Sequence, residues 1–384
     1  MKILMVAGSM HVGGIENQLM HLMRNVDKNK FHIDFTSDMP EAFYREEIEA
    51  LGGNFLLLEN KCRNHPLKYC RELYRIMREG KYDIVHAHEL FHCGITVFVA
   101  ALAGVPCRFT HAHNWREGDD ESGKYSLIRR SYQSVMRTSI RLFSTTQIAC
   151  STWAGKFLYG KKCLKKKSYH LVFNSVDTTK YLDKFDCIEE GDFIEKDGWK
   201  NVINVARVSK VKNQVFLVDI AKELKKRNKK IRILCVGDGD DDEMKQRMMD
   251  EIKESQLSEY IYFLGVRKDV DALLRKCSAF ILPSKYEGMP LVMIEAQATG
   301  LPCISADTYS REVDFEIGKV KWIPLTEGVE TWADSIEAAV EMEKAIKSEV
   351  VNAIENKGFD SKIFTKKICE LYEKDYRRKR EKNN

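Results

Sequence analysis

Short apolar runs alternate with longer amphipathic stretches along most of this chain. The short runs suit buried strands, and the amphipathic stretches show apolar residues at helical spacing. The first series predicts strands at 2–7, 32–37, 54–58, 83–87, 107–112, 146–150 and 170–174, with helices at 15–26, 66–79, 93–103 and 124–143 between most of them. Alternation of this kind predicts a parallel sheet covered by helices, an α/β fold.

A second alternating series begins near residue 201 and predicts a second domain. Its strands are expected near 202–207, 232–236, 261–265, 279–283 and 302–306, with a helix over 213–227. The polar and acidic stretch 178–200 separates the two series, so we place the linker there. The expected organisation is therefore a first domain over 1–180, a second over 200–361, and a last helix within 362–384.

Composition agrees with this organisation. A chain of 384 residues with 44% hydrophobic residues can build two cores of ordinary size. The eleven cysteines are odd in number, form no Cys-x-x-Cys pair and accompany no secretory signal, which favours reduced thiols in a cytoplasmic protein. No apolar run reaches the roughly 18 residues of a membrane span. Residues 1–8 read as a first strand rather than a signal peptide.

The net charge of +5 is unevenly distributed, and the basic excess lies in the first domain. It concentrates in the lysines of 161–167 and in helix 124–143, where Arg130, Arg137 and Arg141 avoid the apolar face formed by Tyr132, Met136, Ile140 and Phe143. A basic amphipathic helix can lie on an anionic membrane. A core-facing helix with a solvated basic side gives the same pattern, and both readings stay open. A nucleic-acid partner is not expected, because no nucleic-acid motif accompanies this small charge.

The segment after the apolar run 279–282 carries candidate chemistry. Glu287 lies on a loop, and Glu295 lies just over one turn into the helix that follows, with Pro290 at its first helical position. Gly288 has no side chain where a ligand could approach the backbone. The N–H groups after it would face an anion. A phosphate and sugar hydroxyls could be held here, although a surface turn before an ordinary helix has the same pattern.

Two cations form a second candidate site. Arg207 ends a predicted strand and Lys212 begins the next helix, so both lie at the carboxyl edge of a parallel sheet, where open α/β sheets bind ligands. Two fixed cations can neutralise a leaving diphosphate without a metal ion. A solvated basic loop is the alternative interpretation, and it suits the neighbouring Lys210.

With these sites, the chain resembles the family 4 retaining glycosyltransferases of the GT-B fold along nearly its whole length. The histidine-rich strands are most similar to those of bacterial exopolysaccharide and capsule glycosyltransferases. The chain departs from the family pattern at Ala206 and Ser175, where members often carry glycine. The resemblance rests on Gly13-Gly14-Ile15-Glu16, Asp83-Ile-Val-His86-Ala-His88, Thr110-His111-Ala-His113-Asn114, Asn174-Ser-Val-Asp177, Arg207 with Lys212, Val236-Gly-Asp-Gly239, and Glu287 with Glu295.

The resemblance implies two Rossmann-like domains facing each other across a cleft, with the C-terminal helix returning to the first domain. It also implies transfer of a sugar from a nucleotide diphosphate donor, expected to be a UDP-sugar, to a hydroxyl acceptor with retention of configuration. The setting would be bacterial exopolysaccharide, capsule or other cell-surface glycan synthesis. The second domain would bind the donor, and the first would bind a glycan or lipid-linked glycan acceptor.

Roles for individual residues follow from the same resemblance. Arg207 and Lys212 would stabilise the leaving diphosphate, and Glu295 would hold the ribose hydroxyls. His113 would contact the transferred sugar, and the backbone of Gly14 would approach the phosphates or the acceptor. The transferred sugar and phosphate would be held by Glu287 and the backbone of Gly288, Met289, Pro290 and Leu291. No metal ion or cofactor is expected.

Two further clusters are interpreted as structural. His111 and His113 are expected on opposite sides of their strand, and His86, His88 and His111 are treated as packing or supporting residues. A zinc site formed by these histidines is conceivable, although no i,i+4 histidine pair or clustered cysteines accompany them. The run Asp238–Glu243 reads as a turn followed by acidic residues that favour a helix N-terminus, rather than as a metal site.

Other functions remain open at this point. A nucleotide-sugar epimerase can use the same fold, and a non-catalytic partner subunit can bind donor without turning it over. A membrane- or nucleic-acid-binding module is disfavoured by the complete donor motif set. The expected location is the cytoplasm, with the inner face of the cell membrane as a candidate surface.

Overall fold

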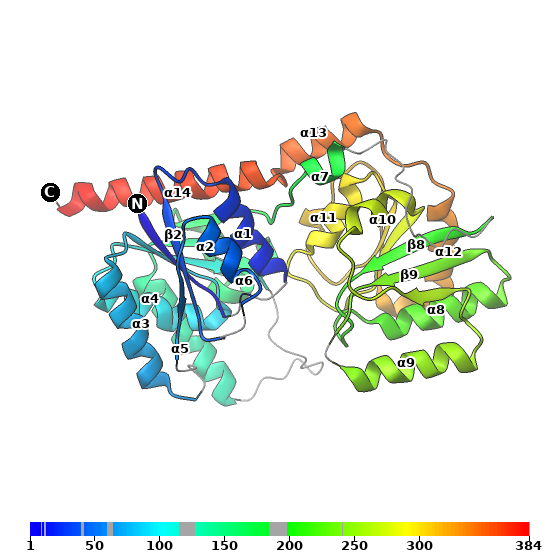
Figure 1. Cartoon of the computed structure of the whole chain (residues 1–384), viewed down its shortest axis with the longest axis horizontal. Coiled ribbons are helices and arrows are strands. Elements are labelled where there is room, and N and C mark those ends of the chain that lie inside the picture. Colours follow the sequence, from blue (N-terminus) through cyan, green and yellow to red (C-terminus); the bar gives the residue numbers. More distant parts are fainter. Residues whose placement is uncertain are drawn as a thin grey trace. The chain divides into compact units, whose positions relative to one another are not determined.

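The computed structural model describes residues 1–8, 10, 13–39, 42–59, 64–114, 127–183, 198–239 and 241–383. The chain divides into two compact units, Met1–Val176 with Gly358–Asn384, and Asp177–Lys357 (Figure 1). The division falls slightly before residue 180, and residues 178–183 of the expected linker region belong to the second unit. Residues 184–197 of that region lie outside the described residues.

The first unit is built on one parallel sheet with the strand order β3-β2-β1-β4-β5-β6-β7. Its strands are β1 (Lys2–Val6), β2 (His32–Ser37), β3 (Phe55–Leu57), β4 (Ile84–Ala87), β5 (Cys107–Ala112), β6 (Thr146–Ala149) and β7 (Tyr169–Leu171). Its helices are α1 (Gly14–Asn25), α2 (Arg45–Ala50), α3 (Pro66–Gly80), α4 (Cys93–Leu102), α5 (Leu127–Phe143), α6 (Thr152–Tyr159) and α14 (Ser361–Asn383).

Helices pack against the first sheet, and the contacts form two separate clusters of buried apolar residues. One cluster joins α1 and α14 to residues of β1, β2 and β5. The other joins α3 and α4 to β1 and β4. The C-terminal helix α14 lies beside α1 in Figure 1 and buries Phe364, Ile368 and Tyr372 at intervals of one helical turn. The end of the chain therefore completes the core of the first unit.

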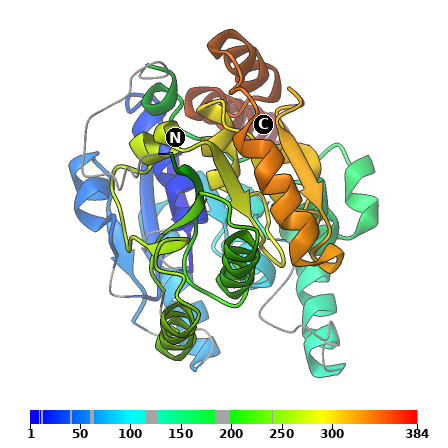
Figure 2. The same ribbon diagram turned by 90° about the vertical axis from the view of Figure 1, so that its right-hand side faces the viewer.

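The second unit contains a parallel sheet with the order β10-β9-β8-β11-β12-β13. One face of it is covered by α8 and α12, and α12 crosses that face in orange in Figure 2. Its strands are β8 (Lys200–Val205), β9 (Ile231–Val236), β10 (Ile261–Phe263), β11 (Ala279–Leu282), β12 (Cys303–Ala306) and β13 (Val320–Ile323). Its helices are α7 (Thr179–Leu182), α8 (Gln214–Lys226), α9 (Asp242–Glu254), α10 (Val270–Lys276), α11 (Leu291–Ala298), α12 (Gly328–Val340) and α13 (Lys347–Lys357).

Candidate functional site

The strand order of the second sheet reverses between β8 and β11. These two strands pair directly, whereas β9 and β10 continue to one side of β8 and β12 and β13 to the other side of β11. Open α/β sheets bind their ligands at such a switch point, beyond the carboxyl ends of the strands. The loops that follow β8 and β11 carry the residues singled out in the sequence.

Side-chain and backbone hydrogen bonds hold these two loops together. The amide of Asn204 donates to the carbonyl of Ile281 (2.8 Å), and the amide of Asn213 donates to that of Pro283 (3.2 Å). The backbone N–H of Lys285 donates to the carbonyl of Val211 (2.8 Å). The loop with the two cations is thereby fixed beside the loop that leads to Glu287.

Lys212 and Glu287 form an ion pair across these loops. Their Nζ and Oε1 atoms lie 2.5 Å apart, and the side chains are 22% and 11% exposed. Arg207 is exposed on the loop after β8, where its carbonyl accepts a hydrogen bond from Gln214 (2.9 Å). The structure therefore brings Lys212 and Glu287 together and leaves the guanidinium of Arg207 in contact with solvent.

Two glycines allow the loop after β9 to pass closely over the loop after β8. A Cβ atom on Gly237 would lie 2.2 Å from the carbonyl oxygen of Ala206, and one on Gly239 would lie 2.0 Å from that of Val208. Gly237 also has a φ of 125°, which side-chain-bearing residues rarely adopt. The small Ala206 is accommodated here, with its N–H donating to Val236 (2.9 Å).

The acidic run after β9 serves the start of α9. Asp238 accepts from the N–H of Gly239 (2.9 Å) and pairs with Lys245 (2.5 Å), whose hydrogen bond lowers the pKa of Asp238. Asp241 caps α9 by accepting from the N–H of Met244 (3.0 Å). The interpretation of this run as a helix start is confirmed by Asp241, Asp242 and Glu243, whereas Asp238 and Gly239 lie in irregular structure and Asp240 lies outside the described residues.

Helix α11 begins one residue later than the sequence predicts. Pro290 has extended backbone angles and occupies the N-cap, so the first helical residue is Leu291. The expectation that Pro290 opens the helix is corrected by one position. Gly288 and Met289 are buried immediately before it, and Glu295 lies just over one turn into the helix. The first N–H groups of a helix lack intrahelical partners, so this end of α11 suits an anion.

Glu295 has a partner that the sequence did not suggest. The hydroxyl of Tyr181, on α7, forms a hydrogen bond with the Glu295 carboxylate. Burial raises the pKa of Glu295, and the Tyr181 hydrogen bond opposes that shift. Helix α7 is itself held by Arg275, which donates to the carbonyl of Lys180 (3.1 Å). The sequence offered one signal, an aromatic residue within a stretch otherwise read as a polar linker.

The remaining expected site residues lie in the first unit. His113 follows β5 and is 5% exposed, and burial lowers its pKa to about 3. Gly14 is the exposed first residue of α1 and follows Gly13, whose backbone is extended. Ser175 is bound by the side chain of Gln18, since its N–H and hydroxyl both donate to Oε1 (2.9 and 3.1 Å). Serine is therefore well satisfied at this position.

The expectation that His111 and His113 face opposite sides is wrong. Residues two apart on a strand point to the same face, because the side-chain period of a strand is two. The rings of His111 and His113 accordingly stack with their centroids 4.1 Å apart.

Comparison with known proteins agrees with this architecture. Residues 12–180 match the family model described as Glycosyltransferase Family 4, and residues 190–357 match Glycosyl transferases group 1. The glycosyltransferase named EpsF from Bacillus subtilis (strain 168) is 31% identical over 387 residues, covering 98% of each chain. The Staphylococcus aureus capsular polysaccharide biosynthesis glycosyltransferase CapH is 27% identical, covering 97% of this chain and 98% of its own.

A solved structure shows the same fold over nearly the whole length. Anabaena Alr3699/HepE, crystallised in complex with UDP and glucose, superposes with a TM-score of 0.75 at 17% identity, covering 97% of this chain and 100% of its own. The two parallel sheets, each covered by helices, are the two Rossmann-like domains of the GT-B fold. The chain belongs to the family 4, group 1 glycosyltransferases of the GT-B fold.

Proposed function

We propose that this enzyme transfers a hexosyl group from a UDP-sugar to a hydroxyl of a cell-surface glycan or its lipid-linked precursor, with retention of anomeric configuration. The observation that carries the proposal is the Lys212–Glu287 pair at the switch point of the second sheet, where Lys212 follows the same strand, β8, as the exposed Arg207. Both charges needed to handle a nucleotide sugar are present there, a cation for the diphosphate and a carboxylate for sugar hydroxyls.

The second unit would bind the donor. Arg207 and Lys212 stabilise the negative charge that develops on the leaving diphosphate, without a metal ion or cofactor. Glu287 and the backbone from Gly288 to Leu291 hold the transferred sugar and the phosphate at the start of α11. Glu295 accepts hydrogen bonds from the ribose hydroxyls, with Tyr181 orienting its carboxylate.

The transfer step would break one bond and form one. The bond from the sugar C1 to the diphosphate oxygen breaks, and the acceptor oxygen bonds to C1 on the same face. The acceptor proton passes to the leaving diphosphate oxygen, and UDP departs. The first unit would supply the acceptor site, with His113 contacting the sugar and the Gly14 backbone approaching the phosphates or the acceptor.

The named relatives support this choice of substrates. HepE was crystallised with UDP and glucose, which favours a UDP-hexose donor here. CapH is named for capsular polysaccharide biosynthesis, which favours a bacterial surface glycan as the product. Such glycans are assembled from cytoplasmic nucleotide sugars, so we place the enzyme in the cytoplasm.

A surface of the first unit suits an anionic membrane, and we include the membrane's inner face in the proposal. On α5, Leu127 and Ile128 are 80% and 83% exposed, and Val135 and Leu142 are exposed as well. Arg130 and Arg141 are exposed on the same helix. Exposed apolar residues interspersed with cations are typical of helices that lie in a membrane interface. Within the described residues, no helix is long and apolar enough to span a membrane.

One residue of the expected basic face does not belong to this surface. Arg137 donates to the carbonyl of Phe157 (2.8 Å) and lies over the ring of Phe91, and its burial lowers its pKa. Its role is therefore packing. The lysines at 161, 162, 165 and 167 are exposed and add to the basic charge of the unit.

A donor screen tests the proposed activity. The purified enzyme is incubated with a panel of UDP-, GDP- and TDP-sugars, with and without glycosyl lipid acceptors, and released nucleotide and product mass are measured. We expect acceptor-dependent release of UDP and a product heavier by one hexosyl residue. Interconversion of donor sugars without an acceptor would instead indicate an epimerase, and binding without turnover a non-catalytic subunit.

A further inference from the structure

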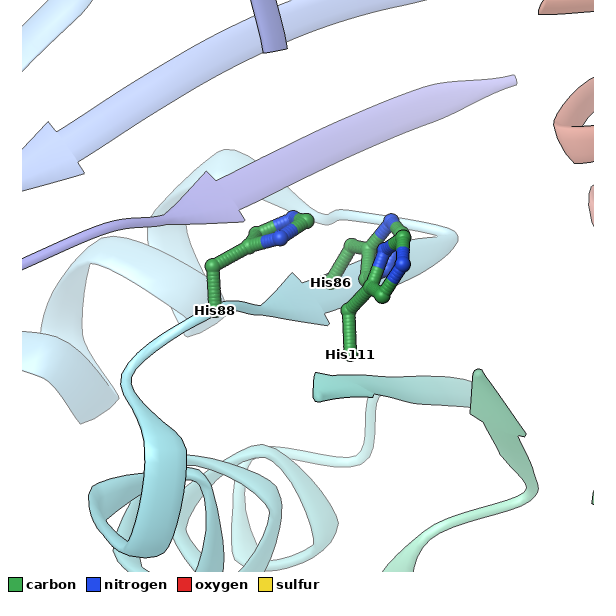
Figure 3. Close-up of side chains that lie close together, drawn as sticks. All are labelled: His86, His88 and His111. Atoms are coloured by element: carbon green, nitrogen blue, oxygen red, sulfur yellow. The ribbon is translucent and has the colours of Figure 1, made fainter. Parts of the chain in front are cut away.

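Four histidines gather on one face of the first sheet. His86 lies on β4 and His88 directly follows it, while His111 lies on the neighbouring β5 and His113 directly follows that strand. All four are buried. Figure 3 shows the rings of His86, His88 and His111 on the same side of the two strands. One ring nitrogen from each of these three lies within 4.8 Å of one from each of the others.

Nitrogen atoms in this cluster lack hydrogen-bond partners. Among the described residues, Nε2 of His86, His88 and His111 is buried without a partner. A buried polar atom without a partner costs free energy, and nearly all such atoms in folded proteins are satisfied. Several of them in one cluster point to a bound group that accepts nitrogen lone pairs.

For His86 and His88, the second ring nitrogen is held in the way that metal-binding histidines usually are. Nδ1 of His86 lies 2.6 Å from the hydroxyl of Tyr372, and Nδ1 of His88 lies 2.9 Å from Nε2 of His113. A metal-bound imidazole typically donates its second N–H to such a partner, which fixes its tautomer and orientation. Burial lowers the pKa of all four histidines, so the neutral, ligating form is favoured.

We propose that His86, His88 and His111 form a binding site for a divalent transition-metal ion, with zinc as the expected occupant. Imidazole nitrogen suits zinc, copper and nickel, whereas magnesium and calcium prefer oxygen ligands. Nitrogens bound to one tetrahedral zinc lie about 3.4 Å apart, from Zn–N bonds of about 2.0–2.1 Å. The rings therefore need to close by no more than about 1.4 Å. The fourth position is left to a hydroxide or water, and hydroxide would offset part of the buried charge.

This metal would have a structural role. It would join β4 to β5 and, through the His86–Tyr372 hydrogen bond, to the C-terminal helix α14. It would also fix the His88 N–H toward Nε2 of His113, which leaves the proton of His113 on Nδ1. The site belongs to the first unit, whereas Arg207 and Lys212 belong to the second, so the proposal does not depend on how the donor diphosphate is neutralised.

The test is the metal content of the full chain, without an affinity tag. Protein produced in zinc-supplemented medium is passed through a desalting column, and its metals are measured by mass spectrometry. We expect about one zinc per chain in the wild type and in His65→Asn, a control at an exposed histidine. His111→Asn should retain less than about a tenth of that zinc. Cobalt loading should give the visible absorption of a tetrahedral nitrogen-ligated site in the wild type and not in His111→Asn.

A second variant with a smaller change distinguishes loss of zinc binding from misfolding, which could also explain a low zinc content in His111→Asn. Tyr372→Phe removes one hydroxyl and should weaken zinc affinity about 10–100-fold while leaving the circular dichroism spectrum unchanged. Zinc should raise the Tm of the wild type, whereas magnesium should not. Wild-type protein that retains no zinc would overturn the proposal, and so would equal zinc content or affinity in the wild type and both variants. Loss of zinc from these variants with full sugar transfer would leave the proposed function intact.

Discussion

At the scale of single residues, the proposed donor site depends on the ion pair between Lys212 and Glu287. Their side chains are 22% and 11% exposed, so water screens this pair less than it screens an ion pair on the surface. Hydrogen bonds such as Asn213 to Pro283 tie the two loops together independently of the pair. Substitutions at the pair should therefore change ligand binding far more than folding.

The cations give the first prediction. Arg207→Ala or Lys212→Ala removes a charge-assisted contact to diphosphate, worth about 1.5–3 kcal/mol. Calorimetric titration should show UDP affinity reduced roughly 10–100-fold. Lys210→Ala is the matched control, because Lys210 is exposed on the same loop and should leave affinity unchanged. Wild-type affinity in both the Arg207 and Lys212 variants would rule out this location of the diphosphate.

The two carboxylates give the second prediction. Glu295→Gln weakens an acceptor for ribose hydroxyls and should lower affinity for UDP and UDP-sugar alike. Glu287→Gln should spare UDP binding and chiefly lower kcat, because its contact is to the departing sugar. Tyr181→Phe, which removes the hydrogen bond to Glu295, should resemble a mild form of Glu295→Gln. The reverse pattern, with UDP binding lost only in Glu287→Gln, would contradict these roles.

At the scale of elements, most strands could be predicted because each is a short apolar run between turn residues. Strand β13 was missed, since Val320–Ile323 includes Lys321 and lies at the sheet edge, where one side needs no apolar cover. Helix α7 was missed because it is short and follows the first series of strands directly. Which histidines face one another depends on the pairing of β4 with β5, and the order of strands in a sheet is not contained in local patterns.

The buried histidines of β4 and β5 make stability depend on pH, in chelator-treated protein. Unfolded histidine has a pKa near 6.5, and burial lowers the pKa of His113 to about 3 and those of the other three well below normal. Below about pH 6.5 the unfolded chain therefore binds protons that the folded chain does not, and stability falls on acidification. Burial raises the pKa of Glu89 to about 7, so this carboxyl binds one proton more readily in the folded chain and offsets part of the loss of stability.

Each histidine should add up to about 1.4 kcal/mol per pH unit to the slope of the free energy of unfolding against pH. Urea unfolding at several pH values between 7.5 and 5.0 measures this slope. His111→Gln removes one titrating group, so its stability should depend less steeply on pH than that of the wild type. Identical slopes would show that His111 titrates normally in the folded protein.

Helix α5 gives a prediction for the membrane surface. Arg130→Glu with Arg141→Glu should weaken binding to anionic vesicles and make it less sensitive to salt, because these cations attract the lipid headgroups. Leu127→Ser with Ile128→Ser should weaken binding to the same vesicles by removing apolar contact. Lys68→Glu with Arg71→Glu, at two exposed cations of α3, makes the same change of charge elsewhere on the unit and serves as the control, and UDP affinity should be unchanged throughout. Equal binding of all variants to vesicles would exclude α5 as the contact surface.

At the scale of the whole molecule, the chain forms two units with separate cores, and we propose that the first binds the acceptor and the second the donor. The two domains could be predicted from the sequence because both halves show the same alternation of strands and helices, and each half carries candidate site residues at the ends of its strands. It could not supply the Tyr181–Glu295 contact or the converging histidines, because both depend on packing between segments distant in sequence.

We expect sugar transfer by the whole enzyme to be independent of added metal ions. The diphosphate is assigned to Arg207 and Lys212, so magnesium or manganese should not be required. The rate of UDP release with EDTA present should stay within about twofold of the rate with added magnesium. A rate abolished by EDTA and restored by magnesium, but not by zinc, would show that a metal ion handles the diphosphate.

The stereochemistry of the transfer product tests whether the enzyme transfers its sugar with retention through the Lys212 site. The enzyme is incubated with the UDP-α-hexose that the donor screen selects and with its acceptor, and the new glycosidic bond is assigned by NMR from its one-bond C1–H1 coupling. We expect an α-linked product from wild-type enzyme and at least tenfold less of it from Lys212→Ala. A β-linked product, or an equal yield from Lys212→Ala, would contradict the proposed function.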